Sequence, residues 1–312
     1  MLIEKCGDEV YSQYRIPGIV VTTNGTLIAY YECRKSNSDW AKIDIKIIRS
    51  TDFGHTWQTV TVIKGDGNTL NNPVMIVKDN QIHFLFLKNY LDLYCAVSTD
   101  DGKSFGSAKK ITLDVPFFYN VIAVGPGHGI VKDGNMLLPV WFAQNKQDKL
   151  AHHPSVISTI YSQDGKTWTL GDIIGKDVLQ NPSECALAVT PQNEVLISIR
   201  NENECKNRAF AVSDNGFSGW RGLHFNPQMI DPICMGSMCY DNKTVYHINC
   251  EHTLLRENLT IKYSRDNFNT FERIPVDNIA GYADIAVLDN TLYVLYERDC
   301  NKGGLYFKRI KL

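Results

Sequence analysis

Short stretches rich in β-branched and aromatic residues recur along the whole chain. Examples are IDIKIIRS, QIHFLFLK, NMLLPVWF, EVLISIR, TVYHIN and TLYVLYE. Each is bounded by Asn, Asp, Gly or Pro, which is the pattern of strands separated by turns. No stretch keeps the apolar spacing and the capping residues that predict a helix. The pattern therefore predicts an all-β protein with little helix.

A short polar motif, Ser-x-Asp-x-Gly-x-Thr-Trp/Phe, follows five of these strands. Its copies are STDFGHTW, STDDGKSF, SQDGKTW, SDNGFSGW and SRDNFNTF, which begin at Ser50, Ser98, Ser162, Ser213 and Ser264. Such a motif predicts a hairpin turn, because Asp accepts bonds from nearby backbone N–H groups and Gly supplies a positive φ. The last copy carries Phe268 in place of the glycine. We interpret the motif as structural and expect no catalytic role for its aspartates, Asp52, Asp100, Asp164, Asp214 and Asp266.

The spacing of the motif predicts the architecture. Units of roughly fifty residues with about four strands each are typical of the blades of a β-propeller. A chain of 312 residues then forms about six blades. One blade lacks the motif, and we expect the C-terminal strand GGLYFKRIKL to complete the blade that the N-terminus opens. No linker or change of composition divides the chain, so we expect a single domain over residues 1–312.

Composition excludes several classes of partner and cofactor. The formal net charge is -2, so the chain has no basic excess with which to bind nucleic acid. No apolar run is long enough for a membrane span. The nine cysteines include no C-x-x-C pair, which argues against a zinc site and a disulfide framework. We expect no metal and no cofactor. The N-terminal residues lack the pattern of a signal peptide, so we expect a cytoplasmic protein.

An arginine and a proline stand where the stretch QYRIPGIV, residues 13–20, begins a predicted strand. Together with the five turns, YRIP resembles the sialidases (neuraminidases), the six-bladed bacterial and animal type in which these turns are called Asp boxes. The resemblance covers most of the chain. It implies the sialidase fold and an exo-sialidase, a glycoside hydrolase that removes terminal sialic acids. Sialylated glycans or oligosaccharides are then the partners, with no nucleic acid or membrane.

The resemblance also implies a set of arginines that binds the substrate carboxylate. Arg15 in YRIP, Arg200 in LISIRNEN and Arg256 in LRENLTIKYSRD match the family's three arginines. Guanidinium suits this task, because its planar fork matches a carboxylate in a bidentate way. Arg34 in ECRKSNSDW matches a further arginine of the family, which lies close to the substrate carboxylate or the acid/base aspartate; the alternative is that it only pairs with Glu32 or Asp39. We expect Arg15 at the mouth of its strand, facing the ligand.

Three further positions match the family's catalytic residues, namely Asp39 in ECRKSNSDW, Glu184 in NPSECALAV and Tyr282 in AGYADIAVL. By the resemblance Tyr282 is the nucleophile, Glu184 its base and Asp39 the acid/base residue of a retaining mechanism. A neutral phenol suits a substrate whose anomeric carbon carries a carboxylate, since an Asp or Glu nucleophile would be repelled. We expect the arginines to favour the phenolate, and burial or Trp40 to raise the pKa of Asp39.

Other residues and functions compete with this interpretation. Asp44 is a rival of Asp39, but its alternation with Ile43 and Ile45 predicts an outward-facing strand residue. His128 in VGPGHGI is expected at the surface or rim, and His152-His153 lacks a third metal ligand. The chain could instead be a propeller that only binds acidic glycans, an enzyme that prefers the sugar KDN, or one that transfers sialic acid. The presence of all three catalytic residues favours an enzyme over a propeller that only binds, and leaves the preference for KDN and the transfer of sialic acid open.

Overall fold

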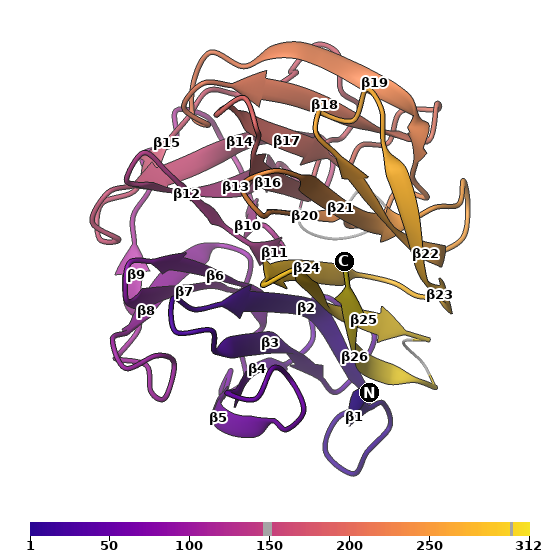
Figure 1. The fold of residues 1–312 in the computed structure, drawn as a ribbon. Coiled ribbons are helices and arrows are strands. Elements are labelled where there is room, and N and C mark those ends of the chain that lie inside the picture. Colours follow the sequence, from indigo (N-terminus) through magenta and orange to yellow (C-terminus); the bar gives the residue numbers. More distant parts are fainter. Residues whose placement is uncertain (146–151, 300–301) are drawn as a thin grey trace.

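The computed structural model describes residues 1–145, 152–299 and 302–312, and over these ranges it contains strands but no helix. The strands form six sheets arranged as the blades of a ring (Figure 1). The predicted all-β, six-bladed propeller is therefore confirmed. In the described part of the chain no helix is available that could cross a membrane.

Three blades come from the first half of the chain, and apart from β11 and β12 their strands run outward from the axis in sequence order. The first blade consists of β2 (Gln13–Val21), β3 (Leu27–Arg34), β4 (Ile43–Ser50) and β5 (Gln58–Ile63). The second consists of β6 (Leu70–Lys78), β7 (Gln81–Lys88), β8 (Asp92–Ser98) and β9 (Lys109–Ile111), with β11 (Gly127–His128) parallel to β6. The third consists of β10 (Val121–Val124), β12 (Ile130–Lys132), β13 (Asn135–Ala143), β14 (Ser155–Ser162) and β15 (Thr169–Leu170).

The remaining blades continue the same meander. The fourth consists of β16 (Cys185–Val189), β17 (Val195–Ile199), β18 (Asn207–Ser213) and β19 (Arg221–Ile230). The fifth consists of β20 (Ser237–Tyr240), β21 (Val245–Cys250), β22 (Glu257–Ser264) and β23 (Glu272–Ile279). The sixth consists of β24 (Ala283–Leu288), β25 (Thr291–Arg298), β26 (Gly304–Lys311) and β1 (Leu2–Lys5).

The two ends of the chain close the ring in the sixth blade. The outermost strand β1 pairs antiparallel with β26, with Leu2 opposite Tyr306 and Lys5 opposite Gly304. This confirms the role predicted for GGLYFKRIKL. It also explains the missing Asp box, because a box joins the third strand of a blade to the fourth. In the sixth blade those strands are β26 and β1, which no turn connects.

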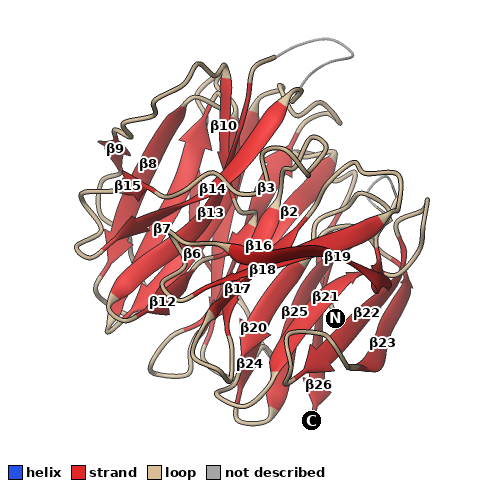
Figure 2. Ribbon diagram, turned by 90° about the horizontal axis from the view of Figure 1, so that it is seen from above, coloured by secondary structure: helices blue, strands red, loops and turns tan. Residues whose placement is uncertain are grey.

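The direction of the strands separates the Asp boxes from the ends where ligands can bind. Within each antiparallel blade, the first strand starts and the second strand ends at the same end of the ring. The third strand starts there and carries its box to the opposite end. Figure 2, turned by 90°, shows loops at both ends of the sheets. The innermost strands β2, β6, β16, β20 and β24 pack around the axis, and β24 meets β2.

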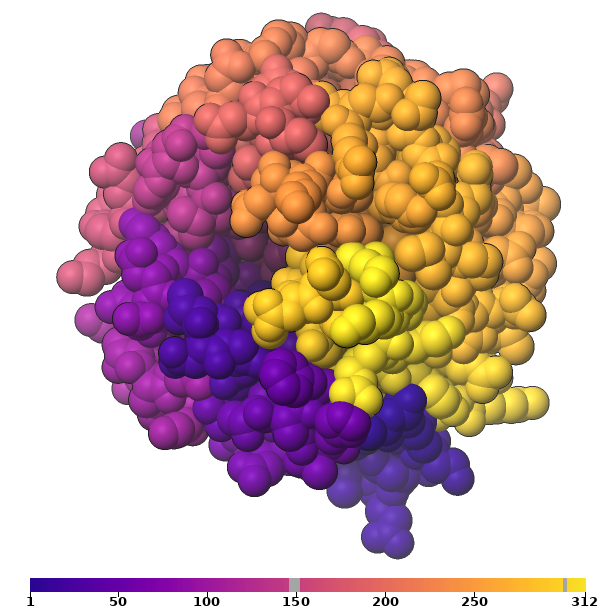
Figure 3. All heavy atoms as spheres, viewed as in Figure 1, coloured from indigo at the N-terminus to yellow at the C-terminus, as the bar shows by residue number. Residues whose placement is uncertain are grey.

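Apolar side chains fill the spaces between neighbouring blades. The largest cluster runs through the second, third and fourth blades and includes Leu85, Trp141 and Ile197. A space-filling view shows the face hollowed at its centre, where segments from different blades meet (Figure 3). Packed blades thus surround a hollow at the centre of this face.

The Asp boxes have the turn geometry expected from their sequence. In the first box the carboxylate of Asp52 accepts bonds from the backbone N–H and the hydroxyl of Thr56, at 2.9 and 2.6 Å. The fourth box corrects one prediction, since Asn215 rather than Asp214 accepts the backbone N–H groups of Phe217 and Ser218. The reason is position, because Asn215 stands two residues after its serine, as the other box aspartates do. Asp214 instead pairs with Arg221.

The strand that carries Arg15 starts earlier than predicted. β2 begins at Gln13, so Arg15 is its third residue and does not stand at its mouth. The pairing with β3 is interrupted between Arg15 and Gly18, and Ile16 has a φ of 55°. Pro17 has no N–H to give to the ladder, which accounts for a bulge here. The bulge turns the Ile16 N–H to the carboxylate of Glu297, at 2.9 Å.

Candidate active site

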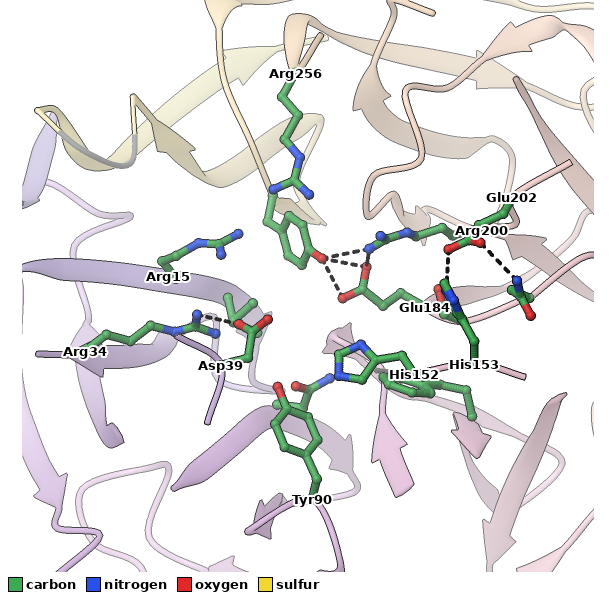
Figure 4. A pocket seen from close by; sticks show the side chains of 16 residues that line it. Arg15, Arg34, Asp39, Tyr90, His152, His153, Glu184, Arg200, Glu202 and Arg256 are labelled. Atoms are coloured by element: carbon green, nitrogen blue, oxygen red, sulfur yellow. Dashed lines mark hydrogen bonds and ion pairs between the residues drawn. The ribbon is translucent and has the colours of Figure 1, made fainter. Parts of the chain in front are cut away.

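A cavity of about 260 Å³ opens at the end of the ring away from the Asp boxes. Five of the six blades supply side chains that Figure 4 labels, among them Arg15 and Asp39 from the first blade and Tyr90 from the second. The structure brings all seven predicted site residues together in its lining, namely Arg15, Arg34, Asp39, Glu184, Arg200, Arg256 and Tyr282. They come from strand ends that meet at one end of the ring.

Tyr282 and Glu184 form a hydrogen-bonded pair in the cavity. Tyr282 directly precedes β24, and Glu184 directly precedes β16. The phenol oxygen lies 2.7 and 2.8 Å from the two carboxylate oxygens of Glu184. Arg200 donates from Nη1 to the phenol oxygen at 2.8 Å and is ion-paired with Glu184. A phenol in this setting has an acceptor for its proton and a cation beside its oxygen.

Burial and the neighbouring positive charges act in opposite directions on the pKa of this phenol. Burial, and then the negative charge of Glu184, raise the pKa of Tyr282 well above its usual range. The positive charges of Arg200 and Arg256 lower this pKa, but their effect is smaller. The arginines thus favour the phenolate, as expected, but burial and Glu184 have the larger effect on the pKa of Tyr282 in the free protein. Tyr282 is a neutral phenol, and Glu184 has to accept the proton during any reaction at its oxygen.

Arg15 and Arg256 flank the ring of Tyr282. The guanidinium carbon of each lies 5.2 Å from the centroid of the tyrosine ring, within the range of a cation–π contact. Arg256 directly precedes β22 and belongs to an exposed segment at the rim of the cavity. Two guanidinium groups and that of Arg200 thus surround one phenol, and their positive charge favours an anion above it.

Glu297 holds Arg15 in place, and sequence reasoning missed it. Its side chain is fully buried at the end of β25 and lies 3.1 Å from Arg15 Nε. It also accepts bonds from the backbone N–H groups of Ile16 and Tyr282, at 2.9 and 3.2 Å. A single carboxylate therefore fixes both a clamp arginine and the strand start that carries the phenol. In the sequence it is one polar residue within TLYVLYER, with no motif around it.

Arg34 pairs with both of its candidate partners. Its buried guanidinium lies 2.6 Å from Glu32 through Nη2 and 2.6 Å from Asp39 through Nη1. The carboxylate of Asp39 is 43% exposed and faces the cavity, whereas Glu32 is fully buried beneath it. Arg34 thus orients Asp39, and it also lines the cavity.

The charge state of Asp39 corrects another prediction. Burial pushes the pKa of Asp39 upward, but the charge and the hydrogen bond of Arg34, together with the charge of Arg15, outweigh it, and the pKa lies below its usual value. Asp39 is therefore ionised in the free protein, and the expected rise of its pKa is wrong for this state. Trp40 packs against Tyr90 at 4.8 Å and His152 at 5.6 Å between ring centroids. The loop that carries Asp39 is anchored by these rings.

The cavity contains residues that the sequence did not reveal. Besides Tyr90 and Trp141 on its wall, the pair His152-His153 lies in the lining. His153 Nε2 lies 2.9 Å from Glu202, which Asn181 also contacts at 3.0 Å. From the sequence both histidines are candidates only for a metal site, and the described residues contain no cluster able to hold a metal. Two adjacent histidines in a loop do not by themselves indicate a function.

The rival residues lie elsewhere. Asp44 does not line the cavity and instead binds Tyr11 and Lys64, at 2.6 and 3.0 Å. His128 is not on the rim, because its side chain is only 12% exposed and pairs with Asp284 at 2.8 Å. It lines a different cavity, of about 450 Å³, between the inner strands. Eight cysteines in the described ranges are free thiols.

Comparison with known proteins assigns the family. Residues 58–278 match the family of BNR repeat-like domains. The chain belongs to this family. A sialidase from Bacteroides fragilis is 26% identical to this BNR repeat-like chain over 99% of the chain and 64% of its own length. The chain thus spans less than two thirds of that relative.

Solved structures show the same fold. A Hadza microbial sialidase superposes with a TM-score of 0.85 at 24% identity and covers 98% of this chain and 67% of its own. Trypanosoma rangeli sialidase in complex with 2,3-difluorosialic acid, described as a covalent intermediate, has a TM-score of 0.77 at 19% identity over 96% of this chain and 54% of its own. This BNR repeat-like protein is thus similar to sialidases in sequence and has their fold.

Proposed function

We propose that this protein is a retaining exo-sialidase that hydrolyses terminal α-linked sialic acids of glycans. The observation that carries the proposal is the position of the Tyr282 phenol oxygen. It touches both carboxylate oxygens of Glu184 and Nη1 of Arg200, in a cavity that Arg15 and Arg256 also line. The sialidase names of the relatives support the same substrate class.

In the first step the sialic acid carboxylate binds the guanidinium groups of Arg15, Arg200 and Arg256. The phenol oxygen of Tyr282 attacks the anomeric carbon, and Glu184 takes the phenol proton. The bond from the anomeric carbon to the leaving oxygen breaks, and Asp39 donates a proton to that oxygen. The product of this step is a sugar bound covalently to Tyr282.

In the second step Asp39 removes a proton from water, and the water oxygen attacks the anomeric carbon. The bond to Tyr282 breaks, and Glu184 returns the proton to the phenol. Two displacements at one carbon restore its original configuration. Hydrolysis therefore releases the sugar with its configuration retained.

Asp39 has to become protonated before it can act as an acid. A bound substrate excludes water from its half-exposed carboxyl group, and desolvation raises the pKa of a carboxylic acid. The substrate carboxylate also offsets the charge of Arg15, which contributes to lowering the pKa of Asp39. Substrate binding thus shifts Asp39 toward the acid form that the first step needs.

The test is release of a fluorescent aglycone from an aryl α-sialoside, with the sugar product followed by NMR. The wild type should release the sugar first as the α-anomer, and Tyr282→Phe should lose at least a thousandfold in kcat while it still binds an unsaturated sialic acid analogue. Tyr263→Phe is the matched control, because that hydroxyl bonds Glu272 on the exposed outer part of the fifth blade. A wild type that binds the analogue without releasing aglycone would favour a glycan-binding propeller, and transfer to an added sugar would show a transferase.

A further inference from the structure

Arg256 differs from the other two arginines of the proposed carboxylate site in what holds it. Arg15 and Arg200 each pair with a buried carboxylate. The guanidinium of Arg256 makes no hydrogen bond or ion pair with any described residue, and no dashed line reaches it in Figure 4. It contacts the ring of Tyr282 at 5.2 Å. The position of Arg256 therefore depends on the backbone segment that carries it.

That segment, residues 251–256, is the loop that connects β21 to β22. Leu254 and Leu255 are 75% and 52% exposed, so apolar packing contributes little to the shape of the loop. At its end the backbone carbonyl of Arg256 accepts a bond from the N–H of Ala280, at 3.3 Å. The conformation of the residues just before Arg256 has to be fixed by other contacts.

The imidazole of His252 supplies these contacts. Its Nδ1 accepts hydrogen bonds from the backbone N–H groups of Leu254 and Leu255, at 3.0 and 2.8 Å. No other described side chain bonds the backbone of residues 253–256. An imidazole nitrogen accepts only while it carries no proton, so the proton of this ring is on Nε2. Because Leu255 directly precedes Arg256, the two bonds fix the backbone from which the arginine side chain starts.

Three turns of the same kind elsewhere in the chain use a carboxylate. Asp8, Asp164 and Asp241 each accept the backbone N–H groups two and three residues further on. A carboxylate at position 252 would attract the guanidinium of Arg256 and compete with the carboxylate of a ligand. An imidazole that accepts through Nδ1 supplies the same bonds without a negative charge.

We propose that His252 is a positioning residue for Arg256. Its Nδ1 holds the turn from which the guanidinium reaches the bound carboxylate, and it leaves the positive charge of that guanidinium to the ligand. Without the two bonds the turn has to be ordered when the ligand binds, and the free energy of this ordering is subtracted from the affinity. Binding should then weaken, whereas the chemical steps at Tyr282 should change little. This inference rests on the proposed sialidase function.

Three substitutions of His252 test the proposal. His252→Phe keeps an aromatic ring but removes the acceptor. His252→Asn restores a neutral acceptor for the N–H groups two and three residues further on, as Asn215 provides in the fourth box. His252→Asp restores the acceptor together with a negative charge. His224→Phe is the control, because that imidazole is exposed and bonds the backbone of Gly222.

Steady-state kinetics on an aryl sialoside gives the expected pattern. His252→Phe should raise KM about tenfold and change kcat by less than about twofold. His252→Asn should recover most of the wild-type KM, His252→Asp should recover less, and His224→Phe should equal the wild type. A KM of His252→Phe equal to that of the wild type, or an equal KM for His252→Phe and His252→Asn, would overturn the proposal.

A double-mutant cycle shows whether His252 acts through Arg256. In an Arg256→Ala background His252→Phe should have no further effect on KM, because the group that it positions is gone. A rise in KM by the same factor in both backgrounds would overturn the proposal, since a general structural role would produce it.

The sialidase function can fail separately from this inference. If the wild type hydrolyses no sialoside, an unsaturated sialic acid analogue is titrated into the same variants by calorimetry, and the same ratios are expected in Kd. If it does not bind the analogue either, hydrogen exchange of the peptide that contains residues 253–256 decides. Faster exchange in His252→Phe and wild-type exchange in His252→Asn would support the positioning role, and equal exchange in all three proteins would overturn it.

Discussion

Replacing Glu297 with glutamine removes a buried negative charge that four donors share. The donors are Nε and Nη2 of Arg15, at 3.1 and 3.3 Å, and the backbone N–H groups of Ile16 and Tyr282, at 2.9 and 3.2 Å. In Glu297→Gln one carboxylate oxygen becomes an NH₂ group, which cannot accept. Two of the four donors then face another donor, and Arg15 loses the opposite charge that pairs with it.

The expected cost follows from burial. Breaking a buried ion pair by removing one partner costs about 3–5 kcal/mol of folding free energy. The side chain of Glu297 is fully buried, but Arg15 is 15% exposed and keeps some contact with water. We therefore expect the lower end, about 3 kcal/mol. Because Arg15 is also released from its fixed position, KM for a sialoside should rise more than kcat falls.

Urea unfolding of the wild type and Glu297→Gln measures the loss of stability, and steady-state kinetics on an aryl sialoside measures the change in KM. Glu194→Gln is the control, because Glu194 pairs with Arg221 at the surface, at 2.5 Å. Such surface pairs contribute at most about 1 kcal/mol. Equal unfolding midpoints for Glu297→Gln and the wild type would refute the reasoning, since the buried carboxylate would then have no structural role.

Three further predictions concern the reaction itself. Asp39→Asn should slow alkyl sialosides by about a hundredfold or more and aryl sialosides with good leaving groups much less; equal losses on both classes would contradict the acid role. Arg256→Lys should raise KM about tenfold, because the charge remains but the fork is lost, and an unchanged KM would argue against bidentate binding. Since Arg34 keeps the pKa of Asp39 low, the acid form becomes scarcer as pH rises, so kcat/KM on an alkyl sialoside should fall between about pH 5 and pH 7. A value that rises over this interval would contradict that assignment.

The fold was predictable because the Asp box is a local device that repeats. Each box needs only a serine, an acceptor two residues later and a turn, so its period appears directly in the sequence. The sequence alone does not show how far the residues of an Asp box can vary while the turn is kept. Asn215 serves as the acceptor of the fourth box, and Phe268 takes a φ of 62° at the glycine position while its ring is fully buried. Tertiary packing allows both exceptions.

The site was predictable where a residue stands in a recognisable motif, as Arg15 does in YRIP. Glu297 and His152 could not be predicted as site residues. Their positions in the site depend on which strand ends meet in space, and no local sequence pattern indicates this. The charge state of Asp39 could not be predicted for a related reason. Its pKa is the difference between burial and opposing charges, and only coordinates give the balance. The roles of the seven site residues stay predictions, as does the single domain.

The most direct test of the account is where a mechanism-based inhibitor attaches. The protein is incubated with 2,3-difluorosialic acid, digested, and mapped by mass spectrometry, with Tyr282→Phe treated in parallel. We expect one adduct per chain on the peptide that contains Tyr282, and no adduct in Tyr282→Phe. An adduct on Glu184, or hydrolysis of sialosides by Tyr282→Phe at the wild-type rate, would contradict the claim that this phenol is the nucleophile.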